Sequence, residues 1–121
     1  MMTGKQETGK KGEQIAMDFY RKQGYRLVAT NWRYGHLEVD IIVENDQTIV
    51  FCEVKTRSSS MAGSPANFVD NAKQRHLIHA ADHYVQWKRV NKEVRFDIIA
   101  ILLTPLGDEL EHIEGAFLPG W

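Results

Sequence analysis

The sequence has little of three things that would define its class at once: cysteine, long apolar segments and an excess of one charge. Its single cysteine, Cys52, rules out a disulfide within the chain and lies in an apolar stretch typical of a buried, unreactive thiol. The longest apolar run, residues 98–103, is far too short to cross a bilayer, and the N-terminus lacks the hydrophobic stretch of a signal peptide. We therefore expect a cytoplasmic protein that does not contact membranes.

The formal net charge is only −1, so no overall attraction draws the protein toward a polyanion. Any affinity for nucleic acid would have to come from local groups of basic residues. The 121 residues, 43% hydrophobic and 26% charged, are typical of one globular domain. We expect a single domain over residues 1–121, with residues 1–7 flexible because they are polar and interrupted by glycine.

Hydrophobic patterns predict two helices and five strands. Apolar residues recur at helical spacing over residues 8–23, where Thr8 is a possible cap, and over residues 65–88. Ser64 and Pro65 fit the cap and first position of the second helix. Runs of β-forming residues predict strands at residues 25–34, 37–43, 48–57, 94–103 and 110–117. The order α-β-β-β-α-β-β indicates an α/β or α+β fold with a mixed central sheet flanked by helices.

Two consecutive strands carry acidic residues between apolar ones. Side chains alternate across a strand, so Glu38 and Asp40 share one face of the second strand. In the third strand, Glu53 shares a face with Lys55. The number of loop residues in the turn "ENDQ" between these strands decides whether the two sets meet.

A two-residue loop, at residues 45–46 or 46–47, would put Asp40 and Glu53 on the same side of the sheet, with their Cβ atoms about 5 to 8 Å apart. An unbulged three-residue loop would separate them. Like charges this close destabilise a sheet unless something neutralises them. A divalent cation would do so directly, because Mg²⁺ binds one or two carboxylates and keeps several waters that a substrate phosphate can replace.

Lys55 would then lie where an ammonium group can hold an attacking water or stabilise charge that develops on phosphorus. The constellation favours metal-assisted hydrolysis of a phosphodiester. By itself, the strand pattern is more typical of a solvated hairpin face, on which Glu53 and Lys55 have no chemical role.

Several motifs in the right order resemble a known family. Asp40, followed after twelve residues by Glu53-Val54-Lys55, resembles the PD-(D/E)XK nuclease superfamily. More closely, the segments "GKKGEQIAMDFYRKQGYRLVATNWR", "LEVDIIV", "VFCEVKTR" and "VRFDIIAI", with the helix that contains Lys73, resemble the YraN-like family of predicted endonucleases. The resemblance covers residues 9–117 and implies a restriction endonuclease-like fold with an α-β-β-β-α-β core.

The resemblance also implies roles for individual residues. Asp40 and Glu53 match the metal carboxylates, and the Val54 carbonyl would be a further ligand of Mg²⁺ or Mn²⁺. Lys55 matches the catalytic lysine. Glu13 matches the first-helix glutamate that completes the metal site in related junction-resolving nucleases. As a plain alternative, Glu13 would be a charge near a helix N-terminus, where the helix dipole favours it.

Two positions depart from the pattern. Val39 stands where the superfamily name has proline, which leaves the chemistry intact. Gly35 is followed by His36 and Leu37 where the family usually has paired glycines, so this turn is expected to differ and could bring His36 near the site.

The basic residues that could contact phosphates are Lys10, Lys11, Arg33, Arg57, Lys73 and Arg75. Such contacts give salt-dependent affinity without reading sequence. Trp32 and Tyr34 could stack on unpaired bases, although aromatic residues at strand ends more often belong to the core or its rim. Glu38 could bind metal or pair with Arg33 or Arg57.

Two further groups of residues have structural explanations. His76, His79 and His83 could project along one side of the second helix, but without a nearby cysteine we predict no zinc site there. Asp97 lies in the most apolar strand and needs a partner if it is buried, and Arg95 on the same face is the simplest one.

Together these features predict a metal-dependent endonuclease that hydrolyses the phosphodiester bonds of DNA, possibly branched or structured, and leaves a 5′-phosphate. At this size, a homodimer or a larger protein partner could supply selectivity for structure. Two alternatives stay open: a nucleic-acid-binding module with this fold but little catalysis, and an adaptor that binds another protein.

Overall fold

The computed structural model describes residues 4–58 and 69–120. Its elements, in chain order, are α1 (Gly4–Lys22), β1 (Arg26–Tyr34), β2 (Leu37–Glu44), β3 (Thr48–Arg57), α2 (Asn71–Lys88), β4 (Glu93–Thr104) and β5 (Gly107–Phe117). This order confirms the predicted mixed α+β fold class. Neither of the two helices in the described residues is long and apolar enough to cross a membrane.

Both helices begin at residues other than those predicted. α1 begins at Gly4 rather than at Thr8, so residues 4–7 are helical where the sequence suggested a flexible segment. α2 begins at Asn71, because the Asp70 side chain accepts a hydrogen bond from the Lys73 amide at 2.9 Å and caps the helix. The predicted start of this helix at Ser64 and Pro65 lies outside the described residues.

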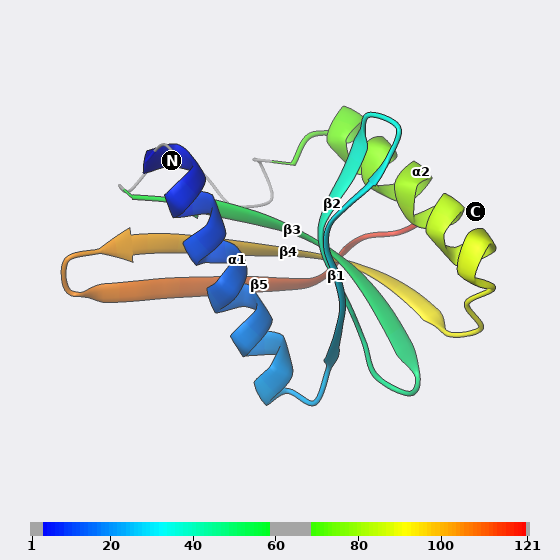
Figure 1. The fold of residues 1–121 in the computed structure, drawn as a ribbon, viewed down its shortest axis with the longest axis horizontal. Coiled ribbons are helices and arrows are strands. Elements are labelled where there is room, and N and C mark those ends of the chain that lie inside the picture. Colours follow the sequence, from blue (N-terminus) through cyan, green and yellow to red (C-terminus); the bar gives the residue numbers. More distant parts are fainter. Residues whose placement is uncertain (1–3, 59–68, 121) are drawn as a thin grey trace.

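The five strands form one sheet in the order β1-β2-β3-β4-β5 (Figure 1). All neighbours are antiparallel except β3 and β4, which are parallel and are joined through α2. α1 covers one face of the sheet and α2 covers the other, so the domain has three layers and two cores. Cys52 lies fully buried in the α1 core, where burial raises the pKa of its thiol, as expected for an unreactive cysteine.

The turn between β2 and β3 has a two-residue loop, residues 46–47. Glu44 pairs with Ile49, and the Asn45 amide donates a hydrogen bond to the Thr48 carbonyl at 2.9 Å. The Asn45 side-chain oxygen also accepts hydrogen bonds from two backbone amides of the turn, those of residues 47 and 48. This confirms the even-numbered loop on which the predicted register of the acidic residues depends.

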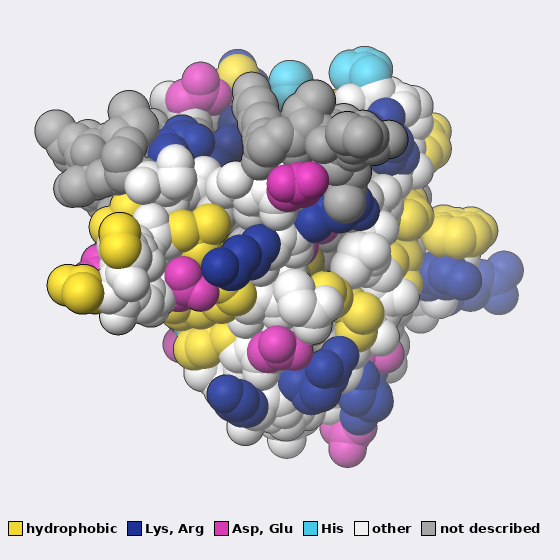
Figure 2. Space-filling model, turned by 60° about the vertical axis from the view of Figure 1, so that its left-hand side comes forward, with side chains coloured by type: hydrophobic (Ala, Val, Ile, Leu, Met, Phe, Trp, Pro, Cys, Tyr) yellow, Lys and Arg dark blue, Asp and Glu magenta, His cyan; other side chains and the backbone are white. Residues whose placement is uncertain are grey.

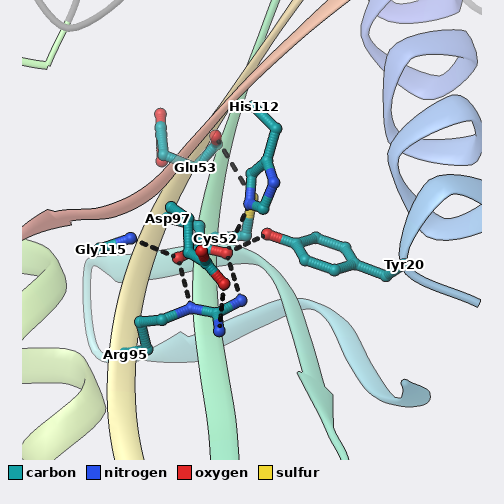
Figure 3. A network of polar contacts seen from close by, with 8 residues as sticks. Tyr20, Cys52, Glu53, Arg95, Asp97, His112 and Gly115 are labelled. Carbon is teal, nitrogen blue, oxygen red and sulfur yellow. Dashed lines mark hydrogen bonds and ion pairs between the residues drawn. The ribbon is translucent and has the colours of Figure 1, made fainter. Parts of the chain in front are cut away.

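A buried carboxylate ties α1, β4 and β5 together (Figure 3). Asp97 is fully buried, and Arg95 donates two hydrogen bonds of 2.9 Å to its two oxygens, which confirms the predicted pair. Tyr20 of α1 donates at 2.8 Å, the Gly115 amide donates at 3.0 Å, and His112 Nε2 lies 2.8 Å from Asp97 Oδ2. Burial opposes the ionisation of Asp97, but these hydrogen bonds hold its pKa below the usual value.

Asp97→Asn should lower the free energy of unfolding by about 3 kcal/mol near neutral pH, because it removes a fully buried anion and leaves Arg95 with only the exposed Glu114 as a partner. Because the native pKa is lowered, the stability from Asp97 is present above the unfolded pKa of about 3.9 and is lost as the pH falls through the native value. Denaturant titrations across this pH range measure both effects. Asp108→Asn, at an exposed position of β5, is the control. Equal losses in the two variants would contradict the role of Asp97.

Gly12 lets α1 approach β3 closely. A Cβ atom at this position would overlap Thr56 Oγ1 and lie 3.0 Å from Thr56 Cβ, whereas a Cβ atom at Gly9 would meet nothing within 4 Å. The absence of a side chain at Gly12 therefore sets the separation between helix and strand, and it also places the next residue, Glu13, beside the end of β3.

Gly12→Ala should destabilise the protein by about 1 to 3 kcal/mol, because an added methyl group in a tight contact forces α1 away from β3. Gly9→Ala is the matched control and should be neutral or stabilising by up to about 1 kcal/mol, because alanine favours a helix. Thermal unfolding of both variants measures the difference. A second change, Thr56→Ala, should recover part of the loss. If Gly12→Ala were as stable as Gly9→Ala, the close approach would not exist in solution.

Candidate active site

A cleft of about 590 Å³ opens where α1, β2 and the end of β3 meet. Glu13 of α1, Asp40 of β2 and residues 53–58 at the end of β3 line it. The three acidic residues that the sequence pointed to, Glu13, Asp40 and Glu53, therefore face the same cleft. Lys55 lines it as well.

The cleft exists because the pairing of β2 with β3 ends there. The ladder runs from Glu44 and Ile49 to Ile41 and Cys52, and Asp40 and Glu53 occupy the next opposed positions. Beyond this point the Val54 amide donates its hydrogen bond, at 2.9 Å, to the Asp40 side chain. The carboxylate thus takes the place of a backbone acceptor and holds its strand against β3.

β2 also changes face at this point. Val39 packs in the core beneath α2, whereas Ile41, two residues later, packs in the core beneath α1. In a regular strand these two side chains would share one face. The irregularity lies at Asp40, which explains how a residue in a buried strand turns its carboxylate toward the cleft.

Glu53 is a nearly fully buried carboxylate, with 3% of the residue exposed. Its Oε1 lies 3.3 Å from the Lys55 ammonium group and 3.7 Å from that of Lys73, which reaches it from the first turn of α2. Its Oε2 is buried and has no hydrogen-bond partner among the described residues. A buried carboxylate oxygen without a partner is costly, so this atom is suited to receive a ligand from the cleft.

Burial and then the charge of Glu53 raise the pKa of Asp40 to about 7, and the charge of Glu13 adds to the effect. The hydrogen bond from Val54 and the charge of Lys73 act in the opposite direction but do not cancel the rise. Near neutral pH, the Asp40 carboxylate therefore favours a proton or another positive partner in the cleft.

Glu13 lines the cleft and accepts a hydrogen bond that the sequence did not suggest. Asn31 donates its side-chain amide to Glu13 Oε1 at 3.1 Å and adopts a left-handed backbone with φ of 50°. Asparagine tolerates this conformation better than most residues.

In the part of the chain that the structure describes, no group of three His, Cys, Asp or Glu side chains is close enough to hold a metal ion. Glu13, Asp40 and Glu53 thus share a cleft, but their side chains are not arranged as a closed metal site.

The predicted phosphate-contacting residues divide into three groups. Arg57 and Lys73 lie at the cleft, the first in its lining and the second against Glu53. Lys11 lies 4.0 Å from Asp108, and Arg33 pairs with Glu38 at 3.1 Å, which selects one of the two partners considered for Glu38. The remaining two, Lys10 and Arg75, are exposed on α1 and α2 respectively. Basic and acidic side chains are intermixed on the face shown in Figure 2.

The histidines lie along α2 rather than in the cleft. His36, at the tip of the β1–β2 hairpin, meets His76 edge-on with ring centroids 6.4 Å apart, and it does not line the cleft. His79 and His83 stack at 4.9 Å, and His83 stacks on Tyr34 at 3.8 Å. These contacts join the hairpin to the outer side of α2.

The fold and cleft define a small three-layer α+β domain with an acidic pocket at the end of a strand ladder. Residues 12–101 match the model of the uncharacterised protein family UPF0102, and the chain belongs to this family. It is 43% identical over 111 residues to a UPF0102 protein of Christiangramia forsetii, covering 92% of this chain and 93% of the relative. It is 38% identical over 116 residues to one of Parabacteroides distasonis, covering 96% of each chain. Membership confirms the predicted relation to the YraN-like family.

Asp40→Asn should stabilise the metal-free protein above pH 7 by about 1 to 3 kcal/mol. The native pKa is raised to about 7, so the native state holds a proton that the unfolded chain releases, and the free energy of unfolding falls as the pH rises from about 4 to 7. Asparagine keeps an acceptor for the Val54 amide and removes the charge. Denaturant titrations in the presence of a chelator measure the effect.

Asp46→Asn, in the exposed β2–β3 turn, is the control and should keep the pH dependence of the unmodified protein. If Asp40→Asn and the unmodified protein showed the same slope of stability against pH, Asp40 would not carry the raised pKa.

Proposed function

We propose that this protein is a metal-dependent endonuclease of the PD-(D/E)XK superfamily, with a restriction endonuclease-like fold, that hydrolyses phosphodiester bonds of DNA. The observation that carries the proposal is the convergence of Asp40, Glu53 and Lys55 on one cleft. The three residues come from two strands whose pairing ends where the cleft begins. The order Asp, then Glu-X-Lys, fits the superfamily pattern.

The residues of the cleft fit a divalent cation. Glu53 Oε2 is buried without a partner among the described residues, and the Asp40 carboxylate lies beside it in the same cleft. The raised pKa of Asp40 comes first from burial and then from the charge of Glu53, and a cation would offset both effects. Both groups offer the hard oxygen ligands that Mg²⁺ and Mn²⁺ prefer. Asp40 and Glu53 would hold the ion, with the Val54 carbonyl and Glu13 as further ligands. When bound, the ion would supply a Lewis acid for the phosphate and lower the pKa of a bound water.

Lys55 supplies a positive charge at the same place. Its ammonium group lies 3.3 Å from Glu53 and lines the cleft, where it can orient a water and stabilise charge on the phosphate oxygens. In the reaction, the water oxygen forms a bond to phosphorus as the bond to the 3′ oxygen breaks. The water loses a proton, the leaving 3′ oxygen gains one, and the products are a 5′-phosphate and a 3′-hydroxyl.

DNA would contact the protein through phosphates. Arg57 and Lys73 lie at the cleft itself, and Lys10, Lys11, Arg33 and Arg75 lie on the surrounding elements. Because these groups do not read bases, binding would be salt-dependent and largely independent of sequence. The proposed substrate is a branched or otherwise structured DNA, and a second copy or a larger protein partner would supply the selectivity for structure.

Cleavage assays test this proposal directly. Purified protein with Mg²⁺ or Mn²⁺ should cut flap or four-way-junction DNA, and Asp40→Asn, Glu53→Gln and Lys55→Met should each lower the rate by about a hundredfold or more, because each removes a ligand or a stabilising charge. Glu111→Gln, at an exposed position on β5, is the matched control and should cut normally. A chelator should abolish cleavage.

Calorimetry with Mn²⁺ separates binding of the ion from chemistry. Heat of binding should appear for the unmodified protein and disappear in Asp40→Asn and Glu53→Gln. Cleavage that persists in all three site variants would come from another site or another protein. Salt-sensitive retention of DNA without cleavage would favour a binding module, and the absence of both would favour an adaptor.

A further inference from the structure

A second hollow, of about 580 Å³, lies between β1 and α2, apart from the acidic cleft. We call it the aromatic hollow, since rings form most of its lining. The lining residues are Trp32, Arg33, Tyr34, His83, Gln86 and Trp87. Of the large aromatic side chains, Trp87 is 64% exposed and Tyr34 48% exposed. Several exposed rings around one hollow mark a binding surface more often than isolated exposed residues do.

The two indole rings of the aromatic hollow are nearly parallel. Trp32 and Trp87 have ring centroids 6.5 Å apart and planes inclined by 20°. Trp32 is braced from the core by Tyr84, which meets it edge-on at 5.3 Å. Tyr84 also meets Trp87 edge-on at 5.9 Å, so one buried ring supports both indoles. The hollow thus has a half-buried ring and an exposed ring held in place, which suits a flat aromatic ligand.

Polar groups at the rim suit a nucleotide rather than a purely apolar ligand. Arg33 and Gln86 line the aromatic hollow, and the Arg33 side chain is 70% exposed although it also pairs with Glu38. The Lys88 ammonium group lies 4.2 Å from the centroid of the Trp87 ring. Donors beside ring faces can bind the edge of a base, and the two cations can bind the adjoining phosphates.

α2 connects the aromatic hollow to the acidic cleft. Lys73, in its first turn, contacts Glu53 of the cleft, and Trp87 lies at the other end of the same helix. Trp87 is fourteen residues after Lys73, a rise of about 21 Å along the helix. A single strand with stacked bases covers this distance in about six nucleotides. His76, between the two ends of α2, contacts His36 of the β1–β2 hairpin.

We propose that the aromatic hollow binds an unpaired nucleobase, and that the substrates of the cleft therefore carry a single-stranded segment about six nucleotides from the bond that is cut. The position of the cut rests on the proposed nuclease function. Binding of the base does not, because it needs neither the metal nor the acidic residues.

Fluorescence anisotropy with labelled DNA, in a chelator and at fixed salt, tests the hollow by itself. The probes are a blunt duplex, the same duplex with a single-stranded extension, and that extension with abasic sites in place of its bases. The unmodified protein should bind the extension most tightly. Trp87→Ala should weaken this binding by about fivefold to a hundredfold. Trp87→Phe should retain most of it, and Leu106→Ala, a fully exposed apolar control on the β4–β5 turn, should change nothing.

Equal affinity for the extension with and without bases would overturn the proposal, and so would unchanged binding by Trp87→Ala. A change in sedimentation of Trp87→Ala without any change in DNA binding would also overturn it, and would assign the hollow to a protein contact. Base-dependent binding by a protein that cuts no DNA would support the hollow and contradict the nuclease function. Cleavage without base-dependent binding would support the nuclease function and contradict the role of the aromatic hollow.

Discussion

The hydrogen bond from the Val54 amide to the Asp40 carboxylate is the contact on which the candidate site depends. It ends one strand ladder with a side chain instead of a backbone carbonyl. Because the backbones of β2 and β3 separate beyond it, two carboxylates can face a shared space without either strand losing its place in the sheet. The same contact leaves Asp40 close to Glu53 in a partly buried setting, and the raised pKa follows from that position.

The two helices complete the cleft from opposite faces of the sheet. α1 brings Glu13, and it can do so because Gly12 lets the helix lie directly against β3. α2 brings Lys73, whose ammonium group shares Glu53 with Lys55. The outer layers therefore add one acidic and one basic side chain to the charged residues that the sheet itself supplies. The arrangement places cations at one oxygen of Glu53 and leaves its other oxygen available.

Local patterns predicted the element order and the register of the acidic residues, since alternation in a strand and a two-residue loop are properties of short segments. The start of α2 at Asn71 was missed because Ser64 and Pro65 offered a stronger signal than the actual cap, Asp70. The Asn31 contact to Glu13 and the Lys73 contact to Glu53 could not be predicted, because they join elements whose distance is set by packing. Likewise, the sequence indicated Arg95 as a partner of Asp97, but it did not indicate the other partners of Asp97, which are Tyr20, His112 and Gly115.

These other partners of Asp97 affect how the domain unfolds. Tyr20 closes the hydrogen-bonding shell of Asp97 from α1, while Gly115 and His112 close it from β5. If α1 or β5 detached alone, Asp97 would lose hydrogen-bond donors while the elements that remain in place still limit its hydration. Partial opening is thereby penalised relative to complete opening. Separate detachment of α1 or β5 should thus be suppressed, and backbone amides near Asp97 should exchange hydrogen with solvent only when the whole domain loses its structure.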